Sequence, residues 1–333
     1  MQALESLTDD GFIINNVIAT EEVQAKLGKR KALHCKASVV KEHLGKTIIQ
    51  YDVEFEDAPA TSWIGILRND RSWRAQEHAF SMLELLTASG FDQTSCYRVP
   101  RPLFFRRSPA FLLMEKAEGR LLVELFEEAR RGKGANSERL DASIRGSALW
   151  LAKLHNAGLR TSKIHSLGDT LTATLKFKEG LIRTFPVISS RIDASSEEMM
   201  SMQRKLIDDR ERKLIHGDYN PTNIFSASGR ITVIDFPESS MGDPAFDLGY
   251  FSAQLKMTFG FGPEIRRATR SFLDEYTEHS PPDSGLEARV RIYEAQTYFQ
   301  RLYHAYCLLG VMPDYQVAMR WVEESMSSLE RAT

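Results

Sequence analysis

Two short apolar segments that enclose a polar loop constrain the fold of this chain more than any other feature. The segment Leu214–Phe225 begins with apolar residues and continues into a loop that carries Asp218 and, five residues later, Asn223. A second apolar segment, Ile231–Ile234, is followed directly by Asp235. Short apolar runs bounded by turn-forming residues are typical of strands. If the two strands fold back on each other, the three polar side chains come to the same end.

These three side chains form a set suited to phosphoryl chemistry. A carboxylate and a carboxamide can bind a hard cation through oxygen, which leaves the other carboxylate free to accept a proton. Phosphoryl transfer needs Mg²⁺ across the nucleotide phosphates and a carboxylate that orients the attacking hydroxyl. Asp and Asn are also common in turns, so any one of them alone would be explained as a turn residue. The three together, at this spacing, favour the catalytic interpretation.

The N-terminal third of the chain is predicted to be rich in strands. Partly alternating apolar and polar residues indicate one strand, and shorter apolar runs indicate two more. Apolar residues at intervals of three and four then indicate a helix that ends before Gly90. The predicted elements are strands at Thr47–Phe55, Trp63–Leu67 and Phe111–Met114, a hairpin loop at Lys41–Lys46, a turn at Asn69–Asp70 and a helix from Ser72 to Ala88.

The rest of the chain is predicted to be mostly helical. Leu140–Ala157 carries one apolar face, and from about Ala288 the spacing of apolar residues indicates two or more packed helices. With 333 residues, of which 42% are hydrophobic, there is enough apolar material for a large core. This length fits either two domains or one enzyme with two lobes.

Charge and cysteine content exclude several classes of protein. Because 43 Lys and Arg oppose 45 Asp and Glu, there is no excess of cations to bind a nucleic-acid backbone. The three scattered cysteines, Cys35, Cys96 and Cys307, form neither a disulfide framework nor a zinc ribbon. The first residues lack a signal-peptide pattern, and no apolar run approaches the roughly 20 residues of a membrane span. We therefore expect a cytoplasmic protein with no membrane or nucleic-acid partner.

The motifs of the 214–249 region resemble those of the aminoglycoside phosphotransferase and choline kinase-like family. They are His-Gly-Asp at His216–Asp218 with Asn223, Ile-Asp-Phe at Ile234–Phe236, and Gly242–Gly249, which reads Gly-Asp-Pro-Ala-Phe-Asp-Leu-Gly. Upstream, Leu151–His155 and Phe111–Glu115 are similar to a helix end and to the strand that enters the hinge of that family. The resemblance covers about residues 60 to 250, and its motifs are more specific in the second half.

The resemblance implies an α+β, bilobed protein-kinase-like fold. The small β-rich N-lobe would comprise residues 1–114 and the larger, mainly helical C-lobe residues 115–333, with the nucleotide across the hinge between them. It also implies a phosphotransferase that uses ATP or GTP with Mg²⁺. The acceptor would be a hydroxyl of a small molecule such as an aminoglycoside, an amino alcohol or a sugar.

Site residues follow from the same match. Asp218 is similar to the catalytic base of the family, and Asn223 and Asp235 match its two metal-binding side chains. Three further residues are expected to support the loop through hydrogen bonds: His216, Asp243 and Asp247.

The N-lobe half of the site is less regular. The position that is usually Lys on the third strand is Arg68, which can still pair with phosphates bidentately. Its expected partner is Glu77, nine residues further on. The resemblance assigns adenine binding to the backbone of Met114, Glu115 and Lys116.

The expected nucleotide loop contains little glycine. No GxGxxG is present, and only Gly45, with Lys41 and Lys46 nearby, marks a candidate loop over the phosphates. Pro237, after Ile-Asp-Phe, also departs from the Asp-Phe-Gly of protein kinases. Both departures favour the small-molecule branch of the fold.

Three other functions remain open from the sequence. A Ser/Thr protein kinase of the same fold and a nucleotide-binding pseudokinase scaffold share the motifs. A metal hydrolase built on His216 and Asp218 is weaker, because no second His cluster at ligand spacing accompanies them. The acidic stretch from Asp274 to Glu287 would suit a cationic acceptor, although a solvated helix end and loop is the simpler explanation.

Overall fold

The computed structural model divides the chain into two compact units. The first unit comprises Met1–Gly119 and Thr232–Glu238, and the second comprises Arg120–Ile231 and Ser239–Thr333. The structure describes residues 2–43, 45–68, 73–91, 96–132, 135–209 and 211–332. The predicted turn at Asn69–Asp70 and the predicted first helical residue, Ser72, lie outside the described residues.

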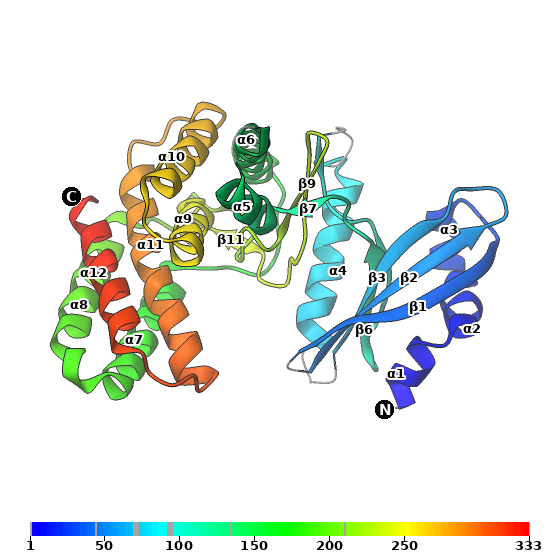
Figure 1. The fold of residues 1–333 in the computed structure, drawn as a ribbon, viewed down its shortest axis with the longest axis horizontal. Helices are drawn as coiled ribbons and strands as arrows, with labels where there is room; N and C mark the ends of the chain where they lie inside the picture. Colours follow the sequence, from blue (N-terminus) through cyan, green and yellow to red (C-terminus); the bar gives the residue numbers. More distant parts are fainter. Residues whose placement is uncertain are drawn as a thin grey trace. The chain divides into compact units, whose positions relative to one another are not determined.

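An antiparallel sheet of five strands forms the centre of the first unit, in the order β1-β2-β3-β6-β5 (Figure 1). Its strands are β1 (Ala32–His43), β2 (Lys46–Phe55), β3 (Thr61–Arg68), β5 (Pro102–Arg106) and β6 (Ala110–Glu115). The other elements are α1 (Gln2–Leu7), α2 (Asp10–Ile13), a π-helical turn at Ile14–Ile18, α3 (Glu21–Leu27), α4 (Trp73–Ala88) and the two-residue strand β4 (Tyr97–Arg98).

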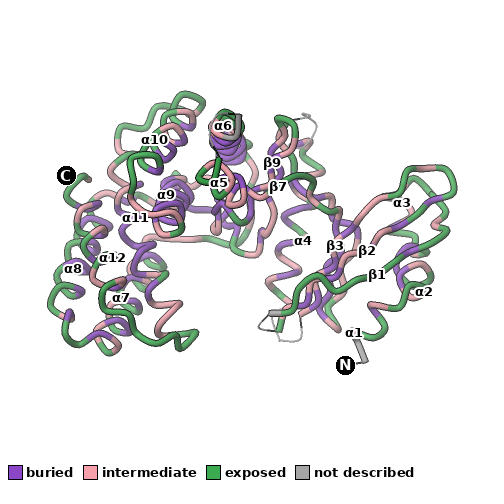
Figure 2. The backbone as a smooth tube through the Cα atoms, viewed as in Figure 1, coloured by how far each residue is buried: buried purple, intermediate pink, exposed green. Residues whose placement is uncertain are grey.

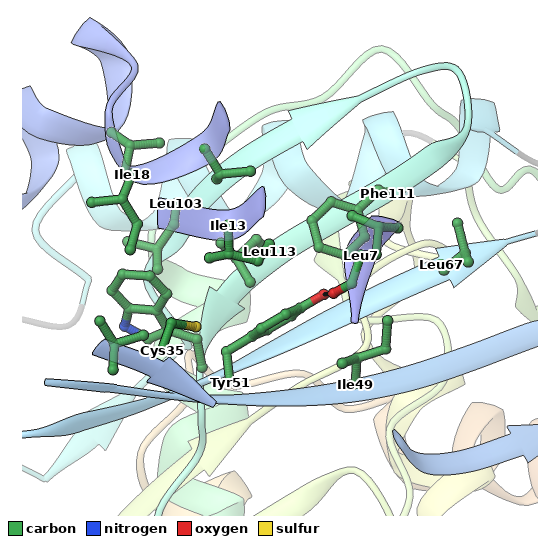
Figure 3. Close-up of a cluster of buried hydrophobic side chains, with 14 of the residues drawn as sticks. Leu7, Ile13, Ile18, Cys35, Ile49, Tyr51, Leu67, Leu103, Phe111 and Leu113 are labelled. Atoms are coloured by element: carbon green, nitrogen blue, oxygen red, sulfur yellow. Dashed lines mark hydrogen bonds between the residues drawn. The ribbon is translucent and has the colours of Figure 1, made fainter. Parts of the chain in front are cut away.

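One face of this sheet carries the core of the first unit. Buried and partly exposed residues alternate along β2, as expected for a strand with one covered face. The buried set packs against apolar side chains of the four N-terminal helical segments, and the phenol of Tyr51 donates to the carbonyl of Leu7 at 2.8 Å (Figure 3). Gly65 is required at the centre of β3, because a Cβ there would lie 2.6 Å from the ring of Phe111. The N-terminal helices therefore cover the sheet.

The strands and the helix predicted in this unit are present. Helix α4 buries Ala79, Met82, Leu83 and Leu86, which have the predicted spacing of three and four. The predicted hairpin loop is shorter than expected, because β1 continues to His43 and β2 already begins at Lys46.

Helices dominate the second unit, as predicted. They are α5 (Leu122–Arg131), α6 (Ala135–Asn156), α7 (Leu167–Thr184), a 3₁₀ turn at Pro186–Ile188, α8 (Ser189–Leu206), α9 (Ala245–Phe259), α10 (Pro263–Glu278), α11 (Leu286–Leu302), a π-helical turn at Tyr303–Leu308 and α12 (Tyr315–Glu330). The short strands are β7 (Arg120–Leu121), β8 (Lys213–Ile215), β9 (Ile224–Ala227), β10 (Arg230–Val233), which ends in the first unit, and β11 (Ser240–Gly242).

Helix α9 lies at the centre of the second unit. It is buried along most of its length (Figure 2). Gly249 lets α11 approach it closely, since a Cβ at this position would lie 2.6 Å from the carbonyl oxygen of Val290. Among the described residues, no helix combines the length and apolar character needed to cross a membrane.

Candidate active site

The loop between β8 and β9 holds the carboxylate of Asp218 in a fixed orientation. Strand β8 pairs with β11 in antiparallel fashion and leads directly into the loop. The side-chain amide of Asn220 donates to Oδ1 of Asp218, and that of Asn223 donates to Oδ2, both at 3.0 Å. Both amides also donate to the backbone carbonyl of Asp218, at 3.1 and 3.0 Å. Each carboxylate oxygen thus has one amide partner, and the carboxylate is partly exposed.

Asp247 on α9 supports this loop through hydrogen bonds to its backbone. It is fully buried and accepts the backbone N–H of His216 at 2.7 Å and that of Gly217 at 2.9 Å. Nε2 of His155 lies 3.0 Å from the same carboxylate. Gly217 adopts a φ of +82°, which L side chains rarely adopt. A buried carboxylate therefore holds the backbone immediately before Asp218.

The rest of the loop is anchored in the core of the second unit. The ring of His216 is buried, and its Nδ1 accepts the backbone N–H of Asp218 at 3.3 Å. Tyr219 is also fully buried, stacks on Trp150 and donates its hydroxyl to the carbonyl of Ser147 at 2.7 Å. The loop is thus held by side chains on both sides of Asp218.

Asp243 connects the start of α9 to α11. Its Oδ1 accepts the backbone N–H of Ala245 at 3.0 Å, and its Oδ2 accepts Nε of Arg289 at 2.7 Å. The same guanidinium donates to Asp283 at 2.6 Å, and this bond holds the pKa of the Asp283 carboxyl below its usual range. Asp243 therefore links α9, the helix that carries Asp247, to α11.

Tyr250 is a site residue that the motif analysis did not identify. Burial raises the pKa of its phenol, and the neighbouring carboxylate of Asp218 raises it further, because ionisation would place two negative charges together. The phenol is therefore protonated at neutral pH and can donate toward Asp218. A sequence signal does exist: Tyr250 follows Asp247 by three residues, and residues three apart share one side of a helix.

Asp235 belongs to the first unit, whereas Asp218 and Asn223 belong to the second. It follows β10 and adopts a φ of +71°, a region that non-glycine residues rarely occupy. Its Oδ2 lies 3.8 Å from Nζ of Lys46. Residues held in such sparsely populated conformations cluster at functional sites.

The donor groups fit a hard cation. The amide nitrogen of Asn223 is used by Asp218, which leaves its amide oxygen as the remaining acceptor. Asp235 offers a carboxylate that is about one-third exposed. Within the described part of the chain, no three His, Cys, Asp or Glu side chains converge on a metal position. An amide oxygen and a carboxylate are each of the ligand type that Mg²⁺ accepts, and proteins usually bind this ion through one or two side chains together with substrate phosphates.

The structure gives Glu77 a different partner from the one suggested by sequence. Oε1 of Glu77 accepts Nε of Arg107 at 2.8 Å. The turn between β5 and β6 brings Arg107 to the start of α4, where it also lies over the ring of Trp73. Arg68, at the end of β3, is instead paired in register with Lys46 on β2.

The expected adenine-binding segment has its amide donors occupied. The N–H of Glu115 donates to the carbonyl of Arg101 at 2.9 Å, and that of Lys116 donates to the carbonyl of Ser62 at 3.0 Å. Met114 lies inside the sheet, opposite Ile64. These two amides are therefore used within the first unit.

The acidic stretch of the sequence lines a separate cavity in the second unit. This cavity has a volume of about 750 Å³ and lies among α10, α11 and the C-terminal parts of α9 and α12. Its lining includes five acidic residues, but five Lys and Arg residues accompany them, and no residue of the 216–223 loop takes part. The stretch therefore forms neither a purely acidic wall nor a wall beside Asp218.

A family model described as the phosphotransferase enzyme family matches residues 66–283. This range contains the loop, its supporting residues and Asp235. The chain belongs to this family. The resemblance predicted from the motifs is thereby confirmed, and the protein is a phosphotransferase. No curated protein gives a significant match to the sequence.

Solved structures show the fold of this phosphotransferase to be protein-kinase-like, as predicted. A choline kinase from Streptococcus pneumoniae has 16% identity and a TM-score of 0.59, with 94% of this chain and 98% of that chain covered. A putative fructosamine-3-kinase from Thermobifida fusca has 18% identity and a TM-score of 0.59, with the same coverage. An amicoumacin kinase in complex with AMP-PNP and Ca²⁺ has 14% identity and a TM-score of 0.60, covering 89% and 88%.

Proposed function

We propose that this phosphotransferase transfers the terminal phosphoryl group of ATP or GTP to a hydroxyl of a small molecule. The observation that carries the proposal is the carboxylate of Asp218, fixed by two amides on a loop that buried Asp247 supports. Two of the structural neighbours are named as kinases of small molecules, one of choline and one of amicoumacin. These names support a small-molecule acceptor over a protein.

In the proposed reaction, Asp218 orients the acceptor hydroxyl and accepts its proton. The acceptor oxygen forms a bond to the terminal phosphorus, and the bond between that phosphorus and the bridging oxygen breaks. The products are a phosphate ester and a nucleoside diphosphate, with the proton on Asp218 until solvent removes it. The protonated phenol of Tyr250 would steady the carboxylate from the side of α9. Positioning and charge stabilisation dominate such reactions.

The amide oxygen of Asn223 and the carboxylate of Asp235 would hold Mg²⁺. When bound, the ion would neutralise negative charge on the phosphates. Arg68 would bind phosphate oxygens, because its guanidinium always carries charge and donates in a planar fork. The carbonyls of Glu115 and Lys116 would contribute to binding the base.

An acceptor screen with a defined product tests this function. The purified chain is incubated with Mg²⁺ and ATP or GTP and with choline-like amines, aminoglycosides, ketosamines, sugars and homoserine. Release of nucleoside diphosphate is recorded, and ³¹P NMR identifies the product. We expect a phosphate monoester with at least one acceptor class, formed about 10²–10⁴-fold more slowly by Asp218→Asn. Phosphorylation of protein substrates alone, with no small-molecule ester, would contradict the proposal.

A further inference from the structure

Strand β2 begins with a lysine, Lys46, on the face of the first unit's sheet opposite the core cluster. The buried residues of β2, such as Ile49 and Tyr51, point into the core cluster (Figure 3). Lys46 belongs to the alternate set and faces the other way. Its partner in register on β3 is Arg68, and side chains of directly paired residues share a face. Two cations therefore stand next to each other on this face.

A carboxylate of the same unit accompanies this pair. Nζ of Lys46 lies 3.8 Å from Oδ2 of Asp235, and the two side chains are 28% and 32% exposed. Like charges directly opposite each other on neighbouring strands destabilise a sheet, and an anion beside them offsets that cost. Asp235 supplies such an anion within the protein. The same position suits the oxygens of a phosphate group.

We propose that Lys46 binds the terminal phosphates of the nucleoside triphosphate and exchanges Asp235 for a phosphate oxygen when the nucleotide enters. The inference rests on the proposed function, since it takes Asp235 as the metal-binding carboxylate. A cation that binds to Asp235 competes with the ammonium of Lys46 for the same oxygens. The displaced ammonium has three donors on a flexible four-carbon stem and can turn to phosphate. The site then uses two cations, from β2 and from β3. The sequence assigns phosphate binding to Arg68 and places Lys46 only near the candidate loop.

The local backbone leaves room for this exchange. Gly45, directly before Lys46, has a φ of +74°, and apart from its two chain neighbours no described heavy atom lies within 4 Å of the position that a Cβ would take there. At that point, no described side chain from elsewhere in the chain blocks the approach of a ligand. This fits a glycine-poor loop in which a lysine side chain, rather than a row of backbone amides, contacts the phosphates.

Nucleotide binding by Lys46 variants tests the proposal without reliance on turnover. Calorimetry with Mg²⁺ and AMP-PNP, and in parallel GMP-PNP, compares wild type with Lys46→Gln and Lys46→Arg. The matched control is Lys31→Gln, because Lys31 also pairs with a carboxylate, Glu56 at 3.2 Å, at the opposite end of the β1–β2 pair. Loss of one charge-assisted contact predicts a Kd about tenfold higher for Lys46→Gln. We expect Lys46→Arg to stay within about threefold of wild type and Lys31→Gln within about twofold.

A second measurement separates phosphate binding from a general loss of structure. Without nucleotide, Mn²⁺ binding followed by electron paramagnetic resonance should be tighter in Lys46→Gln, because its ammonium no longer competes for Asp235. Weaker nucleotide binding with tighter Mn²⁺ binding is the expected pair of results. An unchanged nucleotide Kd in Lys46→Gln, or equal losses in Lys31→Gln, would overturn the role of Lys46 and leave the proposed function intact. Failure of wild type to bind either nucleotide would overturn the proposed function itself.

Discussion

Replacing Asp247 by Asn should destabilise the protein, because this buried carboxylate accepts two backbone N–H groups and faces a histidine. Oδ2 of Asp247 accepts the N–H of His216 at 2.7 Å and faces His155 at 3.0 Å, and Oδ1 accepts the N–H of Gly217 at 2.9 Å. An Asn side chain can place its oxygen on only one of these sides. Its NH₂ group then meets a backbone donor.

The expected magnitude follows from these contacts. A hydrogen bond to a charged group contributes about 1.5–3 kcal/mol, and a buried donor left without a partner costs about 1–3 kcal/mol. With the Asn oxygen facing His216 and His155, one bond is lost at Gly217 and the charge is lost from the others. We therefore expect Asp247→Asn to lower the free energy of unfolding by about 2–5 kcal/mol. Asp247→Ala, which removes every contact, should lower it further, toward the roughly 5–15 kcal/mol that holds an ordinary domain folded.

Urea unfolding followed by circular dichroism measures this change, with the m-value checked for two-state behaviour. The control is Asp274→Asn, because Asp274 is an exposed carboxylate on α10 and should change the free energy by less than about 0.5 kcal/mol. A loss below about 0.5 kcal/mol for Asp247→Asn would show that the buried carboxylate does not hold the loop.

Three further predictions concern the first unit and pH. Gly65→Ala should lower the free energy of unfolding by about 1–3 kcal/mol, because the new Cβ would lie 2.6 Å from the ring of Phe111. Differential scanning calorimetry measures the loss, and an unchanged Tm would contradict the predicted overpacking. Burial lowers the pKa of His165 from 6.5, so the folded state resists protonation and stability falls as pH drops below 6.5. Urea unfolding from pH 7 to 5 should therefore show a shallower decline in His165→Gln, by up to about 1.4 kcal/mol per pH unit, and parallel curves would contradict this. Glu77→Gln should leave the Kd of Mg²⁺·AMP-PNP within about twofold of the wild-type value, because Glu77 pairs with the exposed Arg107. A Kd about tenfold higher than wild type would indicate that Glu77 acts on the phosphate site.

Much of the fold could be predicted because the strands and long helices have clear apolar patterns. The alternation in β2 and the spacing in α4 each report one buried face, which is a local property of the sequence. Helices α1 to α3 have only four to seven residues each, too short to be stable or recognisable alone. Their packing on the sheet depends on contacts distant in sequence.

In the candidate site, too, local motifs could be predicted from the sequence and long-range contacts could not. Asp218, Asn223 and Asp247 were identified because they lie in short motifs with fixed spacing. The partner of Glu77 could not be predicted, because Arg107 reaches it from a turn thirty residues away in sequence. The position of Lys46 beside Asp235 likewise depends on strand register and on a chain segment that returns to the first unit.

Phosphoryl transfer by Asp218→Asn tests the central claim most directly. Turnover and the Kd for Mg²⁺·nucleotide are measured on the same preparation, with the best acceptor found for wild type. Loss of a positioned general base predicts a kcat about 10²–10⁴-fold lower, while the nucleotide Kd stays within about threefold. A kcat within tenfold of wild type would contradict the assignment of Asp218 as the group that receives the hydroxyl proton.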